Sequence, residues 1–391
     1  MNASFDVVIV GGGVTGAAVG YGLAKRGVKT CLVDAVPTFS RASRANMGLI
    51  WCQSKALGCP QFVRWGFASS RAYGNLAAEL KELSGIDTGY APTGGIIPCL
   101  GEAELEARAQ FIEKLRAETE DGTYPASVLS RKELEGMLPK VPFGPEVSGG
   151  IWSDMDGYVD PLHLMFAFRK SFVRLGGTLF AGERVSEVKP SGKGYAVVCG
   201  GRTLECGKAV LAAGLGVRKL AAQLGTDIPV FPNKSQVMLL ERIPADVLPI
   251  PLLGIARTFG GTVMIGAAHE NMGMDRRLTP EVLAANAQWA VCVWPELERK
   301  RILRFWTGLR VWPKDAYPIY DRIPGHENAF VFAMHSAVSL AAILEQALPD
   351  YVMGKPLPPD GAIFGLSRFA GGGSGFQGSA ASSPHAEAPN K

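Results

Sequence analysis

The chain has 391 residues, of which 47% are hydrophobic and 19% are charged, and its formal net charge is +4. This composition is typical of a globular protein and excludes a disordered one, and the lack of long lysine or arginine runs gives no indication of nucleic-acid binding. No apolar run approaches the ~20 residues of a membrane-spanning helix, and the first residues lack the basic segment and cleavage site of a signal peptide, so we expect a cytoplasmic protein that only partner chains would attach to a membrane.

A βαβ unit opens the chain. Residues 5–10 are a continuous apolar run, as expected for a buried parallel strand, and residues 14–26 have the composition of a helix that ends at Gly27. A second buried strand follows at residues 29–33. The sequence therefore predicts two parallel strands joined by a right-handed crossover helix.

Gly11-x-Gly13-x-x-Gly16 connects the first strand to this helix, and Asp34 follows the second strand. Gly11 permits a tight turn, Gly13 lets a pyrophosphate approach the backbone, and Gly16 lets the helix pack closely on the strand. The helix N-terminus offers free N–H groups to the phosphates, and an acid at the position of Asp34 accepts the ribose hydroxyls. This arrangement predicts a dinucleotide-binding site.

Helices and short strands alternate along the rest of the chain. The capping box Ser130-x-x-Glu133 and the Asp160-Pro161 pair indicate two further helix starts. Other helices are predicted over residues 62–83, 102–119, 280–293 and 337–353 and after Gly216, and strands over 178–182, 195–200, 209–214, 302–311 and 329–334 and within 231–268.

Strand-rich stretches interrupt the βα units, which indicates a nucleotide-binding domain assembled from remote segments. We predict an α/β (α+β) fold class, with a Rossmann-like domain of the glutathione-reductase type and an inserted antiparallel-sheet substrate domain. Residues 370–391 are rich in Gly, Ser, Ala and Pro, so we expect them to be disordered. The predicted segments are 1–85, 151–228 and 315–365 for the nucleotide-binding domain, and 86–150 and 229–314 for the substrate domain.

Two later segments indicate which dinucleotide binds. The first, "RASRANMGLI" (41–50), is rich in small and hydroxyl side chains. The second, "KAVLAAGLGVRKLAAQLG" (208–225), carries a strand to another small-residue turn at Ala212-Ala213-Gly214. Both segments suit a bound FAD, whereas a nicotinamide cofactor, the alternative, would leave them without a purpose. The Rossmann-like domain is therefore predicted to bind FAD.

These motifs, in this order, resemble the flavoenzyme family of D-amino-acid oxidase, glycine oxidase and sarcosine oxidase. The resemblance extends to about residue 365 and includes Ser43-x-x-Asn46-x-Gly48 and "GLRVWPKDAYPIYD" (308–321). "HSAVSLA" (335–341) is most similar to the catalytic β subunits of hetero-oligomeric opine, hydroxyproline and proline dehydrogenases and of cyanide-forming glycine dehydrogenase. The chain departs from that subgroup at Ala337, where the subgroup has Gly, and at Ser339, where it has Thr.

The resemblance implies that a hydride leaves a carbon that bears an amine, which gives an imine that water hydrolyses. The protein would hold that carbon against flavin N5, bind the carboxylate and keep the amine neutral. We expect the catalytic subunit of a dehydrogenase for an amino acid or secondary amine of the opine, hydroxyproline/proline or D-amino-acid type. The alternatives are a free-standing glycine, sarcosine or D-amino-acid oxidase and a flavin-containing electron-transfer subunit without its own substrate.

Five residues are predicted to act on the substrate. Arg310 matches the carboxylate-binding arginine of the family, and a planar guanidinium suits a bidentate grip of a carboxylate. His335 would bond the flavin ring or accept a proton from the amine, with Arg257 and His269 as further substrate-binding candidates. Ion pairing or packing is the alternative role for each of them. Met264 aligns loosely with the lysine that activates oxygen in sarcosine-type oxidases, which favours a dehydrogenase.

The seven cysteines are scattered and never spaced as Cys-x-x-Cys, so we expect reduced thiols and no metal site. Any iron–sulfur or second flavin centre is expected on other subunits, and FAD is expected to be held non-covalently. The residues predicted to hold FAD are Gly11, Gly13, Val14, Thr15, Gly16, Asp34, Ala35, Ser43, Arg44, Asn46, Met47, Gly48, Val185, Ala213, Gly214, Arg310, Ser336, Ala337, Val338 and Ser339.

Overall fold

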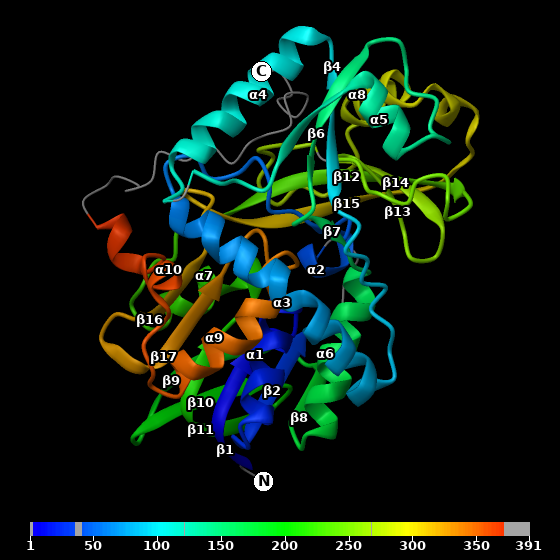
Figure 1. Ribbon diagram of the computed structural model, residues 1–391. Helices are drawn as coiled ribbons and strands as arrows, with labels where there is room; N and C mark the ends of the chain where they lie inside the picture. The colour runs from blue at the N-terminus through cyan, green and yellow to red at the C-terminus, as the bar shows by residue number, and fades with distance from the viewer. Residues whose placement is uncertain (1–2, 36–40, 121, 267, 371–391) are drawn as a thin grey trace.

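A mixed sheet with a parallel core forms the centre of one half of the molecule in the computed structural model, which describes residues 3–35, 41–120, 122–266 and 268–370 (Figure 1). The strand order is β16-β17-β11-β1-β2-β8, and β10 and β9 extend the sheet from β11. The strands are β1 (Ala3–Val10), β2 (Thr30–Ala35), β8 (Thr178–Gly182), β9 (Val185–Ser191), β10 (Gly194–Cys199), β11 (Arg202–Leu211), β16 (Ile319–Ile323) and β17 (His326–Ala333).

β1 lies between β2 and β11 and is parallel to both. Its alternate residues Val7 and Ile9 pack into one hydrophobic core with four helices, and Val8 and Val10 pack into another core on the opposite face. A strand covered on both faces requires an unbroken apolar run, which explains the sequence of residues 5–10. The four helices are α1 (Val14–Lys25), α3 (Pro60–Ser84), α6 (Pro161–Arg174) and α9 (Ala341–Val352).

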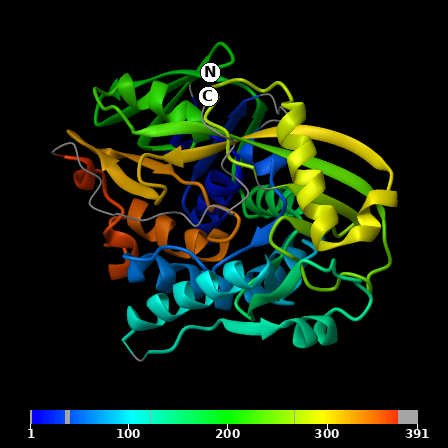
Figure 2. The same cartoon turned by 90° about the horizontal axis from the view of Figure 1, so that it is seen from above.

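Two antiparallel sheets form the other half of the molecule, above the parallel sheet in Figure 1. The larger sheet has the order β13-β14-β12-β15 and the smaller one the order β4-β6-β5. The long strands β12 and β15 run side by side across the molecule (Figure 2). The strands are β4 (Gly95–Leu100), β5 (Ser127–Ser130), β6 (Val147–Ser153), β12 (Val230–Arg242), β13 (Ile255–Arg257), β14 (Thr262–Gly266) and β15 (Ile302–Pro313), and a separate pair is formed by β3 (Leu49–Ile50) and β7 (Gly157–Tyr158).

The remaining helices are short or lie on the antiparallel half. The predicted capping box at Ser130 and the predicted N-cap at Asp160 are both present. The helices are α2 (Ala42–Ala45), α4 (Glu102–Ala117), α5 (Arg131–Met137), α7 (Val217–Ala222), α8 (Pro280–Val293) and α10 (Pro359–Ala362), with 3-10 turns η1 (Gly214–Gly216), η2 (Pro295–Arg299) and η3 (Leu366–Phe369).

The predicted fold class is confirmed, because a Rossmann-like parallel sheet and antiparallel sheets share one chain. The parallel strands come from remote segments, and β6 runs across the predicted boundary at residue 150. The division into the predicted segments stays a prediction. The tail predicted to be disordered lies, except for Ala370, outside the described residues.

The predicted start of the last long helix at residue 337 is wrong. α9 begins at Ala341, and a turn occupies the residues before it, where the Leu340 N–H donates to the Ser336 carbonyl at 3.0 Å. The Ser339 hydroxyl accepts a hydrogen bond from the Trp51 N–H at 3.0 Å, and the Tyr73 hydroxyl donates to the Val338 carbonyl at 2.8 Å. These contacts with remote segments stabilise a turn where a first helical turn was predicted.

Candidate active site

A cavity of about 730 Å³ opens between the carboxyl ends of the parallel strands and the strands β12 and β15. This volume lies within the range of small-molecule and cofactor pockets, and ligands of open α/β sheets bind at the same edge. The lining residues come from both halves of the molecule. Most of them fall within segments 10–15, 33–35, 41–49, 183–186, 212–216, 308–312 and 332–339, and the rest are single residues elsewhere in the chain.

The glycine turn forms one end of this cavity. Gly11 has a φ of +107°, and a Cβ there would lie 2.5 Å from the Ala212 carbonyl oxygen. Gly13 lines the cavity, whereas Gly16 does not. Gly16 packs against the turn instead, since a Cβ there would lie 1.8 Å from the Gly11 carbonyl oxygen. Gly16 therefore provides close packing of α1 on the turn and makes no contact with the cavity.

The N-terminus of α1 faces the cavity with unpaired main-chain donors. The Val14 N–H donates to the Ser43 hydroxyl at 3.0 Å. Within the described residues, the N–H groups of Gly13 and Thr15 have no acceptor. Free N–H groups and the helix dipole favour an anion at this position. The residues present thus fit a pyrophosphate.

Asp34 is buried at the same end and binds two arginines. Its carboxylate accepts hydrogen bonds from the Gly12 N–H at 3.1 Å, from Arg41 at 2.5 Å and from Arg169. Burial alone would raise the pKa of Asp34, but hydrogen bonds and charge from Arg41, with the charge of Arg169, lower it overall. Ribose hydroxyls would have to displace Arg41, the more exposed of the two arginines. Sequence reasoning missed both arginines.

Arg310 lies at the opposite end of the cavity, on β15. Its guanidinium donates to the Asn233 side chain at 3.0 Å, the Ala268 carbonyl at 2.8 Å and the Ser235 hydroxyl at 2.9 Å. Burial lowers the pKa of Arg310 to about 10, so it keeps its charge at neutral pH. In the part of the chain that the structure describes, no carboxylate pairs with it. These neutral partners position the guanidinium and leave its charge for a ligand.

Two histidines, His269 and His335, lie close to Arg310. The ring of Trp312 packs against His335 at 4.6 Å and against His269 at 5.3 Å between centroids. Burial and the charge of Arg310 lower the pKa of His269 to about 3. Burial, followed by the charges of Lys55, Arg310 and His269, places the pKa of His335 well below its ordinary value. Both rings are therefore neutral at physiological pH and can accept a hydrogen bond.

Three further predicted site residues lie outside the cavity, besides Gly16. The guanidinium of Arg44 lies 5.9 Å from the Phe166 ring, and the Arg257 side chain donates to the Ile243 carbonyl at 3.2 Å. Met264 is buried in a small core with Tyr158 and Val237. The other predicted residues line the cavity: Gly11, Gly13, Val14, Thr15, Asp34, Ala35, Ser43, Asn46, Met47, Gly48, Val185, Ala213, Gly214, His269, Arg310, His335, Ser336, Ala337, Val338 and Ser339.

Lys55 also lines the cavity and was missed by sequence reasoning. It lies in an irregular segment before α3, where no motif or periodicity marks it. Burial lowers the pKa of Lys55 overall, although the nearby Cys52 and Asp156 raise it, and the charge of Arg310 adds to the lowering. Two cations thus meet at this end of the cavity.

None of the seven cysteines lines the cavity, which is consistent with a non-covalent cofactor.

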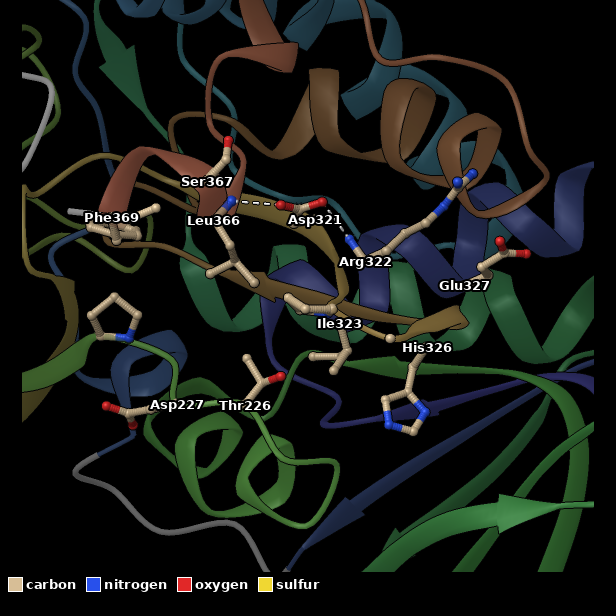
Figure 3. Close-up of a pocket in the computed structure, with 14 residues that line it drawn as sticks. Thr226, Asp227, Asp321, Arg322, Ile323, His326, Glu327, Leu366, Ser367 and Phe369 are labelled. Atoms are coloured by element: carbon tan, nitrogen blue, oxygen red, sulfur yellow. Dashed lines mark hydrogen bonds between the residues drawn. The ribbon is translucent and has the colours of Figure 1, made fainter.

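A second hollow, of about 780 Å³, lies between residues 226–227, the β16–β17 hairpin and η3 (Figure 3). Its central acid is already engaged, because the Asp321 carboxylate accepts hydrogen bonds from the Leu366 N–H at 2.6 Å and the Arg322 N–H at 2.7 Å. Its lining residues differ from those of the cavity of about 730 Å³. That cavity is lined by the glycine turn, Arg310 and the two histidines, and we therefore assign the candidate active site to it.

The sequence profile of the FAD-dependent oxidoreductase family named DAO matches residues 6–344. The chain belongs to this family. It is 33% identical over 365 residues to one of the subunits of opine oxidase from Agrobacterium tumefaciens (strain Ach5), and the match covers 93% of this chain and 97% of that protein. It therefore has the class activity of FAD-dependent oxidation of amines or amino acids.

Solved structures agree with this assignment. Glycine oxidase from Geobacillus kaustophilus superposes with a TM-score of 0.86 at 27% identity, over 95% of this chain and all of that one. L-Proline dehydrogenase from P. horikoshii has a TM-score of 0.81 at 20% identity, over 94% of this chain and 98% of that one, and so supports the fold. Among the described residues, no helix has the length and apolar character needed to cross a membrane.

Proposed function

We propose that the protein is the catalytic subunit of a dehydrogenase that oxidises the C–N bond of an opine-type amino acid and passes the electrons to a partner subunit. The observation that carries the proposal is the Arg310 guanidinium, which lines the FAD-sized cavity and has only neutral partners among the described residues. The similarity to the opine oxidase chain, itself one of several subunits, supports both the substrate type and the partner.

The residues that hold the cofactor are proposed to be those of the glycine turn, Ser43 and the 335–339 turn. Bound FAD would accept the hydride from the substrate carbon. Arg310 binds the substrate carboxylate and so fixes the carbon that reacts. The positive charges of Arg310 and Lys55 disfavour a third cation, so the amine gives its proton to solvent and binds in its neutral form. The electron pair of the nitrogen then completes a C=N bond, which water hydrolyses.

A free-standing oxidase is the second candidate, and Lys55 is the observation that favours it. Met264, which the sequence places at the oxygen-activating lysine of sarcosine-type oxidases, is buried outside the cavity. Lys55, by contrast, is a lysine that lines it. An oxidase of this kind would transfer the electrons of the reduced flavin to O2.

Anaerobic mixing of the purified protein with an opine tests the proposal. We expect the visible absorption band of the flavin to bleach, and a dye acceptor to restore it faster than air does. Bleaching followed by rapid peroxide formation would instead identify the oxidase. A flavin that no opine, proline or D-amino acid reduces would contradict both functions.

A further inference from the structure

Lys55 brings a second positive charge into the substrate end of the cavity. Its ammonium donates to the Trp51 carbonyl at 2.9 Å. The buried Asp156 carboxylate acts on it from beyond ion-pair distance and raises its pKa, and no carboxylate of the described residues forms an ion pair with it, whereas Arg41, at the other end, is paired with Asp34. A partly buried cation without an anion is costly unless a ligand supplies one.

The backbone around Lys55 is held in a conformation that side chains rarely adopt. Ser54 has a φ of +54° and Ala56 a φ of +63°, and in the described segments only Ala316 shares this feature among the non-glycine residues. The Ser54 N–H donates to the Tyr124 hydroxyl at 3.0 Å, which fixes the segment. Such local strain concentrates at functional sites. The two positive φ angles flank Lys55, which indicates that the backbone is strained in order to direct this side chain into the cavity.

The positive charges of Lys55 and Arg310 at this end of the cavity favour a ligand with negative charge. The charges of Lys55 and Arg310 both reach His335 and lower its pKa. The acids that line the cavity are engaged elsewhere: Asp34 with its arginines, and Glu183 with Arg202 at 3.1 Å. When one substrate carboxylate binds Arg310, Lys55 still has no ion-pair partner among the described residues.

We propose that Lys55 binds a second carboxylate of the substrate, so that the enzyme selects secondary amines with a carboxylate on each side of the nitrogen. This inference rests on the proposed function and deepens it. Arg310 takes the carboxylate next to the carbon that loses the hydride, and Lys55 takes the carboxylate of the other substituent. Amino acids with a single carboxylate leave Lys55 unpaired and bind more weakly.

Two amines that differ by one carboxylate test the proposal: N-(1-carboxyethyl)alanine and N-ethylalanine. The rate of anaerobic flavin bleaching is measured against amine concentration for the wild type, Lys55→Met, Lys55→Arg and the control Lys132→Met, an exposed lysine on α5. We expect Lys55→Met to raise the half-saturating concentration of the dicarboxylate about 100-fold and that of N-ethylalanine less than about twofold. Lys55→Arg restores most of the dicarboxylate affinity, and Lys132→Met behaves as the wild type.

Other outcomes would overturn the proposal. An equal loss with both amines would make Lys55 a general support of the flavin or of the fold, and a loss confined to reoxidation by O2 would make it an oxygen-activating group. If neither amine bleaches the wild-type flavin, the proposed function fails, but calorimetric titration still decides the role of Lys55. The proposal requires glutarate to bind the wild type more tightly than butanoate does, and Lys55→Met to remove that difference.

Discussion

The glycine-turn end of the cavity and its Arg310 end present different chemistry. At the first end, the main-chain N–H groups and the Asp34 carboxylate come from one contiguous βαβ unit, and only Arg169, one of the two arginines on that carboxylate, comes from a remote helix. At the second end, Arg310, Lys55 and two neutral histidines come from strands and turns that are remote in sequence. The first end suits a cofactor common to the whole family, whereas the second carries charges that distinguish one substrate from another.

The largest expected effect concerns the segment that follows β15, the strand that carries Arg310. Asp315 follows β15, and its buried carboxylate binds Arg368 at 2.7 Å. Arg368→Met leaves that charge unpaired, and we expect the free energy of unfolding to fall by about 3–5 kcal/mol. Chemical denaturation measures this change, with the exposed Arg299→Met as the control. A loss below about 1 kcal/mol would show that this ion pair contributes little to the stability of the fold.

Arg310→Met tests the substrate end alone. Removing one side of a charge pair costs about 2–5 kcal/mol, so kcat/KM for the amine substrate should fall at least about thirtyfold. The FAD content should stay at the wild-type level, because the glycine turn is untouched. Arg310→Lys keeps the charge but not the planar fork, and an intermediate loss is expected. Loss of FAD from Arg310→Met would contradict the separation of the two ends.

Gly16→Ala tests the cofactor end alone. The added methyl would lie 1.8 Å from the Gly11 carbonyl oxygen, so the turn must shift. We expect a loss of stability of about 2 kcal/mol and purified protein with little bound FAD. Gly136→Ala, also within a helix but with open space around it, should retain FAD and be slightly more stable. Full FAD occupancy in Gly16→Ala would show that the turn tolerates displacement.

The smallest expected effect is a pH dependence near Lys55. Burial raises the pKa of Asp156 to about 7, and its carboxylate accepts the Cys52 N–H at 2.6 Å. Because the folded-state pKa lies above the unfolded one, the stability that this group contributes is present at low pH and lost as pH rises through about 7. We expect the protein to be about 1 kcal/mol less stable at about pH 8 than at about pH 6, and Asp156→Asn to remove this difference. An unchanged profile in Asp156→Asn would assign the dependence to other groups.

The sequence predicts the cofactor end well because its determinants are local. Gly11, Gly13 and Asp34 follow strands in one contiguous βαβ unit, so their proximity follows from the motif itself. Arg169, which binds Asp34, lies far along the chain on α6, and no spacing rule connects it with the motif. Its contact depends on the packing of α6 beside α1.

Predictions at the substrate end depend on which face of a strand a side chain occupies. Alternate residues of a strand point to opposite faces, so a register error of one residue reverses the result. The sequence predicts Met264 and Arg257 in the cavity, but one lies in a buried core and the other bonds the Ile243 carbonyl. Lys55 escapes notice because an irregular segment has no periodicity from which to infer direction. Arg310 is located through the family resemblance.

The contact of Arg41 with Asp34 has a consequence for how the cofactor enters. A carboxylate that already holds two guanidinium groups releases one of them before it receives sugar hydroxyls. When the cofactor binds the apoprotein, its ribose hydroxyls therefore replace Arg41 as partners of the Asp34 carboxylate. Because the Asp34 carboxylate is buried, dissolved salt screens this ion pair only weakly, so the exchange should depend little on ionic strength.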